Sequence, residues 1–313
     1  MIEQSEKGLD SLIGLSDIKK VAYRDIRASI ATGEQFPHTL LGGNGGLGKS
    51  SLSFAISYEL GYHYEMIEGA MVKTRNILQQ KLTDASNASR YYNKKLFFFV
   101  DEVHRLLQEP QEALYYPMVN GQIAGSNIKL QPFTVCVATT NSNLLLGPFL
   151  SRLQNKWYLD RYRKEDICKM VIKWLGDLSL DYEVGCINII SNRSLGVPRT
   201  AYNLVRKIRN EVLSRGGIKK VLVSDCTNTF VLESIDPIGL TKDQVVYLQA
   251  LQKAGGTPKG VGGLAGAIDR DILVVSESIE PILLSLKFID RTARGRVLTE
   301  KGYKHLAETN QLF

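Results

Sequence analysis

Residues 43–50 read GNGGLGKS, and this stretch fits the pattern G-x-x-x-x-G-K-[ST]. Its glycines permit backbone angles and close approaches that other residues avoid, so backbone N–H groups can converge on an anion. Residues 38–43 (HTLLGG) predict a short buried strand before the loop, and residues 50–60 predict a helix that Gly61 ends. Because such a helix directs its positive N-terminal end at the loop, the arrangement predicts a triphosphate-binding P-loop.

Two side chains of this loop have separate tasks in the predicted site. Lys49 is expected to reach the β- and γ-phosphates, and Ser50 is expected to offer its hydroxyl to Mg²⁺. We therefore expect ATP and Mg²⁺ as the bound groups, with GTP as the alternative nucleotide. The expected nucleotide-binding residues of the loop are Gly43, Gly45, Gly46, Leu47, Gly48, Lys49, Ser50 and Ser51.

An acidic pair follows the next clear strand. Residues 96–100 (LFFFV) are apolar throughout and predict a buried strand, and Asp101 and Glu102 come directly after it. Asp101 is expected to hold Mg²⁺ through water, and Glu102 to orient the water that attacks the phosphate. An acidic pair at a strand end is common by itself, but its place after a P-loop predicts a nucleotide hydrolase.

A third buried strand is predicted over residues 133–140 (FTVCVATT), ending at Thr140. Strands that alternate with helical stretches, such as residues 16–31 with Ser16 as the N-cap, predict an α/β fold in which helices cover a parallel sheet. Ligands bind at the carboxyl ends of parallel strands. Thr140 is therefore a candidate sensor of the γ-phosphate or the attacking water, with a simple strand cap as the alternative.

Helical patterns replace strands after about residue 160. Residues 236–240 (DPIGL) predict a linker, and after it short helices, two short strands around residues 293–295 and a final helix predict a winged helix. We expect a large ATPase domain over residues 1–160, a helical domain over 161–238 and a winged-helix domain over 239–313.

The composition is that of a folded, basic protein, with 44% hydrophobic residues, 23% charged residues and a net charge of +7. Residues 1–150 are neutral overall, whereas residues 151–239 carry +5 and residues 240–313 carry +2. This excess favours a nucleic acid partner for the C-terminal half, with a solvated basic surface as the alternative.

The four cysteines form no C-x-x-C pair. This argues against a zinc site or a disulfide framework and favours a reducing cytoplasm. The N-terminus lacks an apolar signal core, and no apolar run approaches ~18 residues, so we expect neither a secretion signal nor a membrane span.

Two arginines are candidates for cations that act on the γ-phosphate. Arg152 follows the predicted sheet within PFLSRLQ (148–154), and Arg199 begins a predicted helix within GVPRTAYN (196–203). Arg152 could stabilise developing charge from a neighbouring subunit, and Arg199 could couple the nucleotide state to the domain angle. Isolated arginines are usually surface residues, so each role depends on the motif around it.

Taken together, these motifs resemble the RuvB family of Holliday-junction branch-migration AAA+ ATPases over nearly the whole chain. The D-E-x-H-R-L, G-x-P-R-x-A-x-x-L and R-T-x-R-G-R-x-x-T patterns are more particular to that family than the P-loop is. The segments that carry the resemblance are residues 12–20, 46–52, 100–106, 132–145, 196–209 and 288–306.

The resemblance implies an AAA+ domain, a helical lid and a winged helix, assembled as a hexameric ring around duplex DNA. It implies that Asp101 and Glu102 are the Walker B pair and Thr140 is sensor 1. It also implies that Arg152 is the finger that acts in a neighbouring subunit, and that Arg199 is sensor 2.

Two further groups of residues follow from the resemblance alone. Leu12, Ile13 and Tyr162 correspond to the adenine pocket, with backbone contacts from Ile13 and apolar cover from Tyr162. The wing arginines would lie near the DNA backbone and give salt-sensitive, sequence-independent affinity, although a basic turn that faces water is the alternative. These arginines are Arg291, Arg294 and Arg296.

The chain also departs from the family pattern. RuvB proteins have two prolines where Asn44 and Gly45 stand, and usually an arginine where Leu150 stands. They carry a β-hairpin that grips the partner RuvA, whereas residues 121–131 (GQIAGSNIKLQ) are shorter here. Each strand residue spans only ~3.3 Å, so this hairpin would project little. We therefore doubt a RuvA-like partner.

Three functions remain open from the sequence. The leading hypothesis is an ATP-dependent DNA motor that drives Holliday-junction branch migration in recombination and repair. The alternative is an AAA+ loader for a sliding clamp or a replicative helicase, which the L-S-R-L segment around Arg152 also fits. A nucleotide-locked architectural DNA binder is a third possibility, against which the presence of Glu102 and Arg152 argues.

Overall fold

The structure is a computed structural model that describes residues 8–216 and 220–309. Residues 1–7, on which part of the expectation of no leader depends, lie outside the described residues. The chain falls into two compact units, Met1–Asp166 and Ile167–Phe313, called here the N-terminal and C-terminal units. No helix in the described part of the chain is long and apolar enough to cross a membrane.

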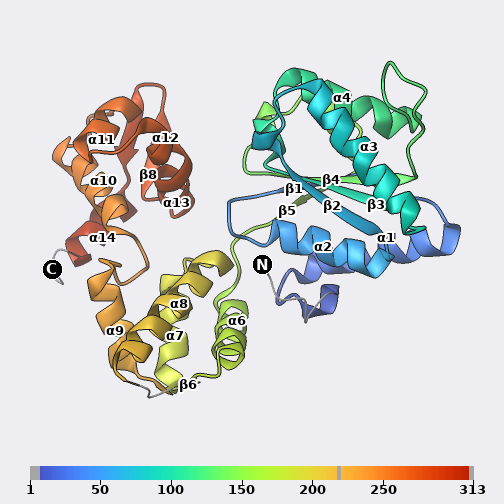
Figure 1. Ribbon diagram of the computed structural model, residues 1–313. Coiled ribbons are helices and arrows are strands. Elements are labelled where there is room, and N and C mark those ends of the chain that lie inside the picture. The colour runs from blue at the N-terminus through green and yellow to red at the C-terminus, as the bar shows by residue number, and fades with distance from the viewer. Residues whose placement is uncertain (1–7, 217–219, 310–313) are drawn as a thin grey trace. The chain divides into compact units, whose positions relative to one another are not determined.

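A five-stranded parallel sheet forms the centre of the N-terminal unit, in the order β2-β3-β4-β1-β5 (Figure 1). The three predicted strands are confirmed as its inner strands. Their backbones are covered on both faces, which is why each reads as an apolar run. The strands are β1 (Thr39–Gly42), β2 (His63–Glu68), β3 (Leu96–Asp101), β4 (Phe133–Thr139) and β5 (Asn155–Tyr158).

The two edge strands were not predicted. In β2 only Ile67 is buried, and in β5 only Trp157 is buried, so neither strand shows the continuous apolar run of an inner strand. Both strands are placed by pairing: β2 lies in register along β3, and β5 lies along β1. The search for apolar runs therefore found the three inner strands of the sheet and missed its two edge strands.

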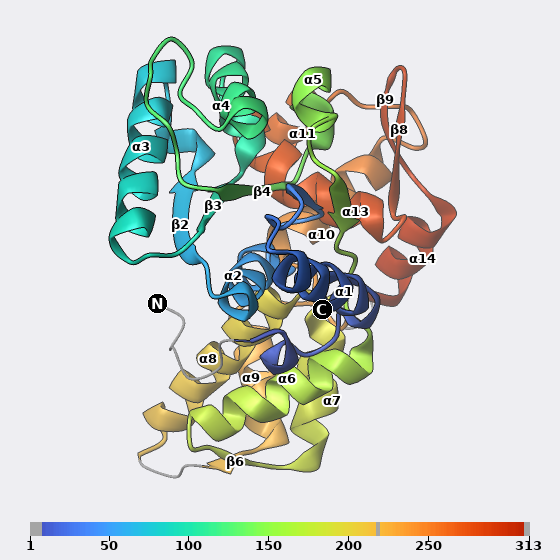
Figure 2. The same cartoon turned by 90° about the vertical axis from the view of Figure 1, so that its right-hand side faces the viewer.

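Helices cover both faces of the sheet (Figures 1 and 2). Helices α1 (Ser16–Thr32) and α2 (Lys49–Leu60) lie on one face, and α3 (Arg75–Tyr91) and α4 (Gln108–Asn120) on the other. Ser16 as the N-cap of the first helix is wrong, because the helix starts at Ser16 and the capping position is Leu15, whose φ is 55°. Short helical turns complete the unit: η1 (Leu9–Ser11), η2 (Gly69–Met71), η3 (Val103–Arg105), η4 (Ser142–Leu144) and α5 (Gly147–Leu150).

Residues 121–131 form a small hairpin that closes on the core. Gln122 and Lys129 make an antiparallel bridge, and the side chains of Ile123 and Leu130 are buried in the main hydrophobic cluster of the N-terminal unit. Polar contacts tie the hairpin to α3: Gln79 Nε2 donates to the Ala124 carbonyl at 3.3 Å. The hairpin is thus packed against its own unit.

Four helices open the C-terminal unit. They are α6 (Lys164–Asp177), which begins just before the unit boundary, α7 (Val184–Arg193), α8 (Pro198–Ser214) and α9 (Val223–Leu232). A two-stranded ladder of β6 (Asp181–Tyr182) and β7 (Lys220–Val221) lies beside them. The helical pattern predicted after residue 160 is present.

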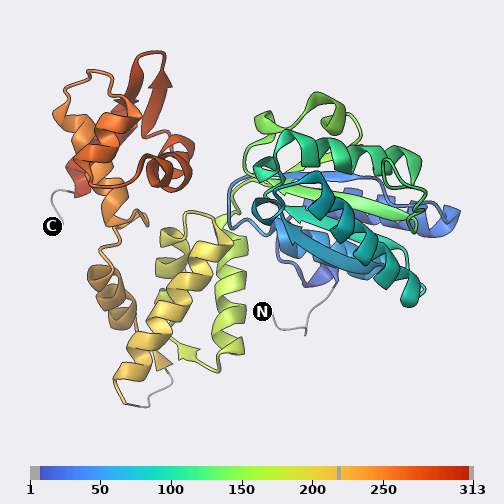
Figure 3. The same ribbon diagram turned by 45° about the horizontal axis from the view of Figure 1, so that its top comes forward.

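A winged helix closes the C-terminal unit (Figure 3). The predicted pair of strands is an antiparallel hairpin, and Lys259 adds a backbone bridge to Arg296 at its edge. Its elements are α10 (Lys242–Lys253), α11 (Val261–Ala267), α12 (Ile272–Val274), the π-helical turn η5 (Val275–Ile279), α13 (Glu280–Ser285), β8 (Ile289–Thr292), β9 (Gly295–Leu298) and α14 (Glu300–Thr309).

The segment predicted as a linker is a fixed joint. Asp236 is buried, and its Oδ1 accepts hydrogen bonds from three consecutive backbone N–H groups, those of residues 238–240. Its Oδ2 lies 2.8 Å from Nε2 of His305 in α14, and Arg193 Nε donates to its carbonyl at 3.2 Å. These contacts join the helical segment to the winged helix. The three-domain division stays a prediction.

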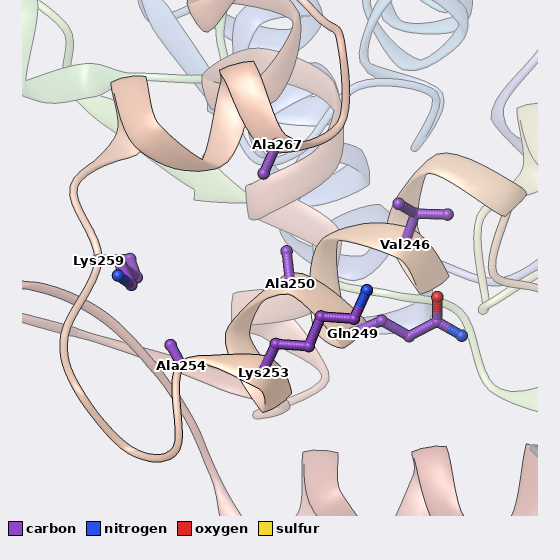
Figure 4. Close-up of a pocket in the computed structure, with 7 residues that line it drawn as sticks. All are labelled: Val246, Gln249, Ala250, Lys253, Ala254, Lys259 and Ala267. Atoms are coloured by element: carbon purple, nitrogen blue, oxygen red, sulfur yellow. The ribbon is translucent and has the colours of Figure 1, made fainter.

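A hollow of about 330 Å³ lies on the winged helix between α10 and α11 (Figure 4). Mainly small or flexible side chains line it: Val246, Gln249, Ala250, Lys253, Ala254, Lys259 and Ala267. No acidic or aromatic group lines the hollow, so it lacks the metal ligands and the base contact predicted for the nucleotide.

Candidate active site

The glycine loop follows β1 and leads directly into α2. Gly43 has a φ of 128°, and a Cβ there would lie 2.4 Å from the Leu159 carbonyl oxygen, so no other residue fits this position. Gly48 has a φ of 91° and serves as the N-cap of α2. Gly45, Gly46 and Leu47 lie between them, and Ser50 and Ser51 lie in the first turn of the helix. The loop is thus bent so that α2 starts beneath it.

Lys49 directs its ammonium group into this loop. Its Nζ donates to the carbonyl oxygens of Gly43 at 2.7 Å and Asn44 at 3.0 Å. The residue is only 6% exposed, which is rare for a lysine and marks a position where its charge is used. The cation is therefore held inside the arc of the loop, where a phosphate would replace the carbonyl contacts.

Ser50 and Asp101 come together although 51 residues separate them. The Ser50 hydroxyl donates to Asp101 Oδ2 at 3.3 Å, and the backbone N–H of Glu102 donates to Oδ1 at 3.0 Å. A hydroxyl and a carboxylate are the hard oxygen ligands that suit Mg²⁺, which is usually held by few protein groups together with water and phosphate. The donor set therefore fits the expected metal.

The Glu102 side chain is held by two polar neighbours. Thr140 Oγ1 donates to Glu102 Oε2 at 3.3 Å, and His104 Nδ1 lies 3.2 Å from the same oxygen. His104 Nδ1 also lies 3.0 Å from Thr139 Oγ1. The backbone of Glu102 adopts the left-handed region, with φ 47° and ψ 49°, a conformation uncommon for glutamate. The glutamate predicted to orient water is thus fixed in a specific position.

His104 and Thr139 were missed as functional residues by the sequence analysis. The available signal was the histidine two residues after Glu102 in the D-E-x-H pattern. The contact between His104 and Glu102 could not be predicted from this pattern, because it depends on the short turn η3, which directs the ring back toward the carboxylate.

Gly69 is a third missed residue. A Cβ at Gly69 would lie 2.5 Å from the carbonyl oxygen of Glu102 and 3.2 Å from that of Asp101. The register of the sheet explains this approach, since Glu68 of β2 pairs with Asp101 of β3. Because β2 itself was not predicted, Gly69 could not be placed beside the acidic pair from local pattern.

The predicted base pocket is brought together beside the loop. The Tyr162 hydroxyl donates to the Leu47 carbonyl at 3.0 Å, and a Cβ at Gly14 would lie 2.8 Å from the Tyr162 ring. Leu12 and Ile13 precede Gly14 directly and are partly buried. Burial raises the pKa of Tyr162 above its ordinary value, so the ring stays neutral. Base contact by these residues stays a prediction.

The two predicted cations belong to different units of the chain. Arg152 follows α5 and is exposed, with its guanidinium 5.7 Å from the centre of the Tyr115 ring. Leu150, at the position where the family usually has an arginine, packs against the hydrophobic core. Arg199 belongs to the C-terminal unit, where it is exposed in the first turn of α8. Their roles as finger and sensor stay predictions.

An internal ion-pair network engages two of the three wing arginines. Fully buried Glu280 accepts from Arg291 at 2.7 Å and from Arg296 at 2.7 and 3.0 Å. Tyr247 donates to the same carboxylate at 2.8 Å. Arg294, by contrast, is exposed at the turn between β8 and β9. DNA contact by these arginines stays a prediction, and Arg291 and Arg296 also have a structural role that was not foreseen.

This network decides the charge of Glu280. Burial acts to raise the pKa of its carboxyl group, but hydrogen bonds from Arg296, Tyr247 and Arg291 outweigh burial and hold the pKa below its ordinary value. The carboxylate is therefore ionised at neutral pH and fixes the base of the wing.

Two family models match the chain. Residues 5–159 match the Holliday junction DNA helicase RuvB P-loop domain, and residues 237–307 match the RuvB C-terminal winged helix domain. The first match contains the glycine loop and the acidic pair, and the second contains the Glu280 network.

Whole-length relatives agree with these matches. The "Holliday junction branch migration complex subunit RuvB" of Thermosipho melanesiensis is 32% identical, over 95% of this chain and 96% of that protein. Its counterpart in Thermotoga maritima is 30% identical, over 98% of this chain and 94% of that protein. The solved structure of the Thermotoga maritima RuvB Holliday junction branch migration motor aligns with a TM-score of 0.86 at 30% identity, over 96% of this chain and 97% of the other.

Proposed function

The chain belongs to the RuvB family, and from this premise we propose that it is an ATP-dependent motor that moves duplex DNA and drives branch migration of Holliday junctions in recombination and repair. The observation that carries the proposal lies in the N-terminal unit. That unit contains the glycine loop with Lys49, the Ser50–Asp101 pair, and Glu102 hydrogen-bonded by Thr140.

The residues of the site divide the hydrolysis between them. Lys49 would exchange its two carbonyl contacts for phosphate oxygens, and Ser50 and Asp101 would hold Mg²⁺. Mg²⁺ bound with ATP would neutralise charge on the phosphates. Glu102 would accept a hydrogen bond from the attacking water, and its neighbour Thr140 would contact that water or the γ-phosphate.

Coupling to movement requires a second subunit. Arg152 is exposed, as a cation must be if it completes the site of a neighbouring subunit in a hexameric ring. Arg199 lies in the first turn of α8 in the helical segment, so contact with the γ-phosphate would transmit the nucleotide state to that segment. The fixed joint at Asp236 would then carry the motion on to the winged helix.

The partner protein is expected to differ from that of other family members. The hairpin of residues 121–131 is short, its apolar residues Ile123 and Leu130 are buried in their own unit, and its backbone is tied to α3. We therefore propose that the chain does not bind RuvA through this hairpin.

A cytoplasmic location is proposed from membership of the RuvB family.

The loader alternative is not supported. The match to the RuvB winged helix over residues 237–307 and the full-length relatives favour the branch-migration motor. No separate observation in the described residues favours a clamp or helicase as the client.

The test uses the purified full chain with ATP, Mg²⁺ and a synthetic four-way junction, with and without a RuvA protein. We expect ATP hydrolysis that duplex DNA accelerates, ring-shaped particles in electron micrographs, and junction migration that added RuvA does not change. Glu102→Gln should abolish hydrolysis and migration while nucleotide binding remains. A protein that binds ATP but neither binds DNA nor hydrolyses faster with it would contradict the motor.

A further inference from the structure

A group of exposed aromatic and basic side chains lies where α3 ends and β3 is about to begin. Residues 90–95 read RYYNKK. Tyr91 is 84% exposed and Tyr92 is 59% exposed, which is unusual for large rings on a folded surface. We call the aromatic–basic patch the set of Arg90, Tyr91, Tyr92, Lys94 and Lys129.

The rings of the patch are held in place. Tyr92 stacks on His63 at the start of β2, with ring centres 5.4 Å apart and planes inclined by 23°. Tyr91 meets Tyr92 edge to face at 5.2 Å and 82°. The turn beneath is fixed by Asn93, which has a φ of 52°, and by the backbone bond from Lys94 to Ser89. The rings thus form a pre-ordered platform.

Cations flank the rings. The Arg90 guanidinium donates to the Lys129 carbonyl at 3.2 Å, which brings the basic residue of the small hairpin next to the end of α3. Lys94 is exposed on the turn itself. Lys95 is not included in the patch, because its ammonium group donates to the Glu34 carbonyl and lies 5.7 Å from the centre of the Tyr62 ring.

This concentration of positive charge is local. Residues 1–150 as a whole carry as many acidic as basic side chains, so the patch stands out from a neutral unit. Asp84 accepts a hydrogen bond from Gln80, and Glu65 lies 3.9 Å from His63, so neither carboxylate pairs with a cation of the patch through these contacts. The patch therefore offers charge complementarity to an anion.

From this geometry we propose that the aromatic–basic patch binds single-stranded nucleic acid, with bases stacked on Tyr91 and Tyr92 and phosphates near Lys94, Lys129 and Arg90. Rings beside a basic track are the combination that holds single strands without sequence preference. A protein partner is the alternative that the test separates, because tyrosine and arginine are common in protein interfaces whereas lysine is depleted there. The patch adds a second nucleic-acid contact to the duplex contact assigned to the winged helix, and it does not rest on the motor activity.

The test measures fluorescence anisotropy of a labelled oligothymidylate and of a labelled blunt duplex with the full-length protein. Tyr91→Ala combined with Tyr92→Ala should weaken single-strand binding at least about tenfold, since each stacked base contributes strongly. Duplex binding and ATP hydrolysis should stay within about twofold of the unmodified protein, because the two tyrosines precede β3 whereas the acidic pair lies at its far end, and the wing belongs to the other unit. The matched control is Tyr58→Ala, which removes a ring that is 53% exposed on α2 beside Glu59.

A second variant tests the phosphate contacts. Lys94→Gln should reduce the slope of log affinity against log salt for the single strand by about 0.7. Unchanged single-strand affinity in the double tyrosine variant overturns the proposal. So does an equal loss for duplex, which would indicate general damage or one shared surface. Loss of a protein partner with single-strand affinity intact would assign the patch to protein docking and would also overturn the proposal.

Discussion

His104 Nδ1 lies 3.2 Å from Glu102 Oε2, and this contact ties the expected water-orienting carboxylate to a ring only two residues further along the chain. Thr139 holds the same ring nitrogen at 3.0 Å, so the imidazole is positioned from the end of β4 as well. The orientation of Glu102 is thus set jointly by β3, η3 and β4.

His104→Ala should lower kcat for ATP hydrolysis about tenfold, because a hydrogen bond to a charged group is worth about 1.5–3 kcal/mol. KM for ATP should change by less than about twofold, since His104 is not expected to touch the nucleotide. His104→Gln keeps a donor near the carboxylate and should recover part of the rate. Steady-state kinetics of both variants test this, and an equal rise of KM in both would contradict a positioning role.

Gly69→Ala should impair hydrolysis without weakening nucleotide binding. The new methyl group would lie 2.5 Å from the Glu102 carbonyl oxygen and would push the acidic pair away from its position. We expect kcat to fall by about 10- to 100-fold, because small misplacements of reacting groups have effects of this size.

A labelled ATP analogue should bind to the Gly69→Ala variant with unchanged affinity. The control is Gly176→Ala in α6, where an added Cβ meets no atom within 4 Å. A full rate in the Gly69 variant would show that the turn at Glu102 accommodates the methyl group.

Lys49→Ala should remove nucleotide binding together with hydrolysis. The ammonium group held at the Gly43 and Asn44 carbonyls is expected to bind phosphate. Its loss should raise the Kd for ATP by about 10- to 100-fold, as removal of a charge-assisted hydrogen bond does. Equilibrium binding in Mg²⁺ buffer measures this directly. Binding that survives in Lys49→Ala but fails in Glu102→Gln would reverse the assigned roles.

Glu280→Gln should destabilise the winged helix by about 1–3 kcal/mol, because it removes the buried anion that pairs with the partly exposed Arg291 and Arg296. Thermal unfolding followed by circular dichroism would report the change. Glu300→Gln, in the exposed first turn of α14, is the matched control and should have little effect.

The same carboxylate predicts a pH dependence. The folded-state pKa of Glu280 lies below its ordinary value of 4.5, so its stabilising contribution is present above pH 4.5 and is lost as the pH falls through the lower folded-state pKa. The free energy of unfolding should therefore decline in this acidic range in the unmodified protein. Glu280→Gln should lack this component, and a parallel decline in both proteins would remove Glu280 as its source.

Much of the fold followed from local pattern. The apolar runs before Gly43, Asp101 and Thr140 predicted the three inner strands, because a strand covered on both faces must be apolar throughout. Spacing also predicted the helix after the P-loop and the paired strands of the wing. These features depend on residues close together in the chain.

The remaining features depend on pairing across the fold. Strand β2 has a mixed pattern, and only its register with β3 places Gly69 against the backbone of Glu102. The ring of His104 reaches Glu102 because η3 turns the chain back. In the wing, sequence showed three similar arginines, and only the burial of Glu280 between α10 and β9 separated Arg296 from exposed Arg294. Sequence alone determined which chemical groups the chain carries, and the tertiary structure decided which of them meet, because charges and hydrogen bonds act over distances that chain separation does not reveal.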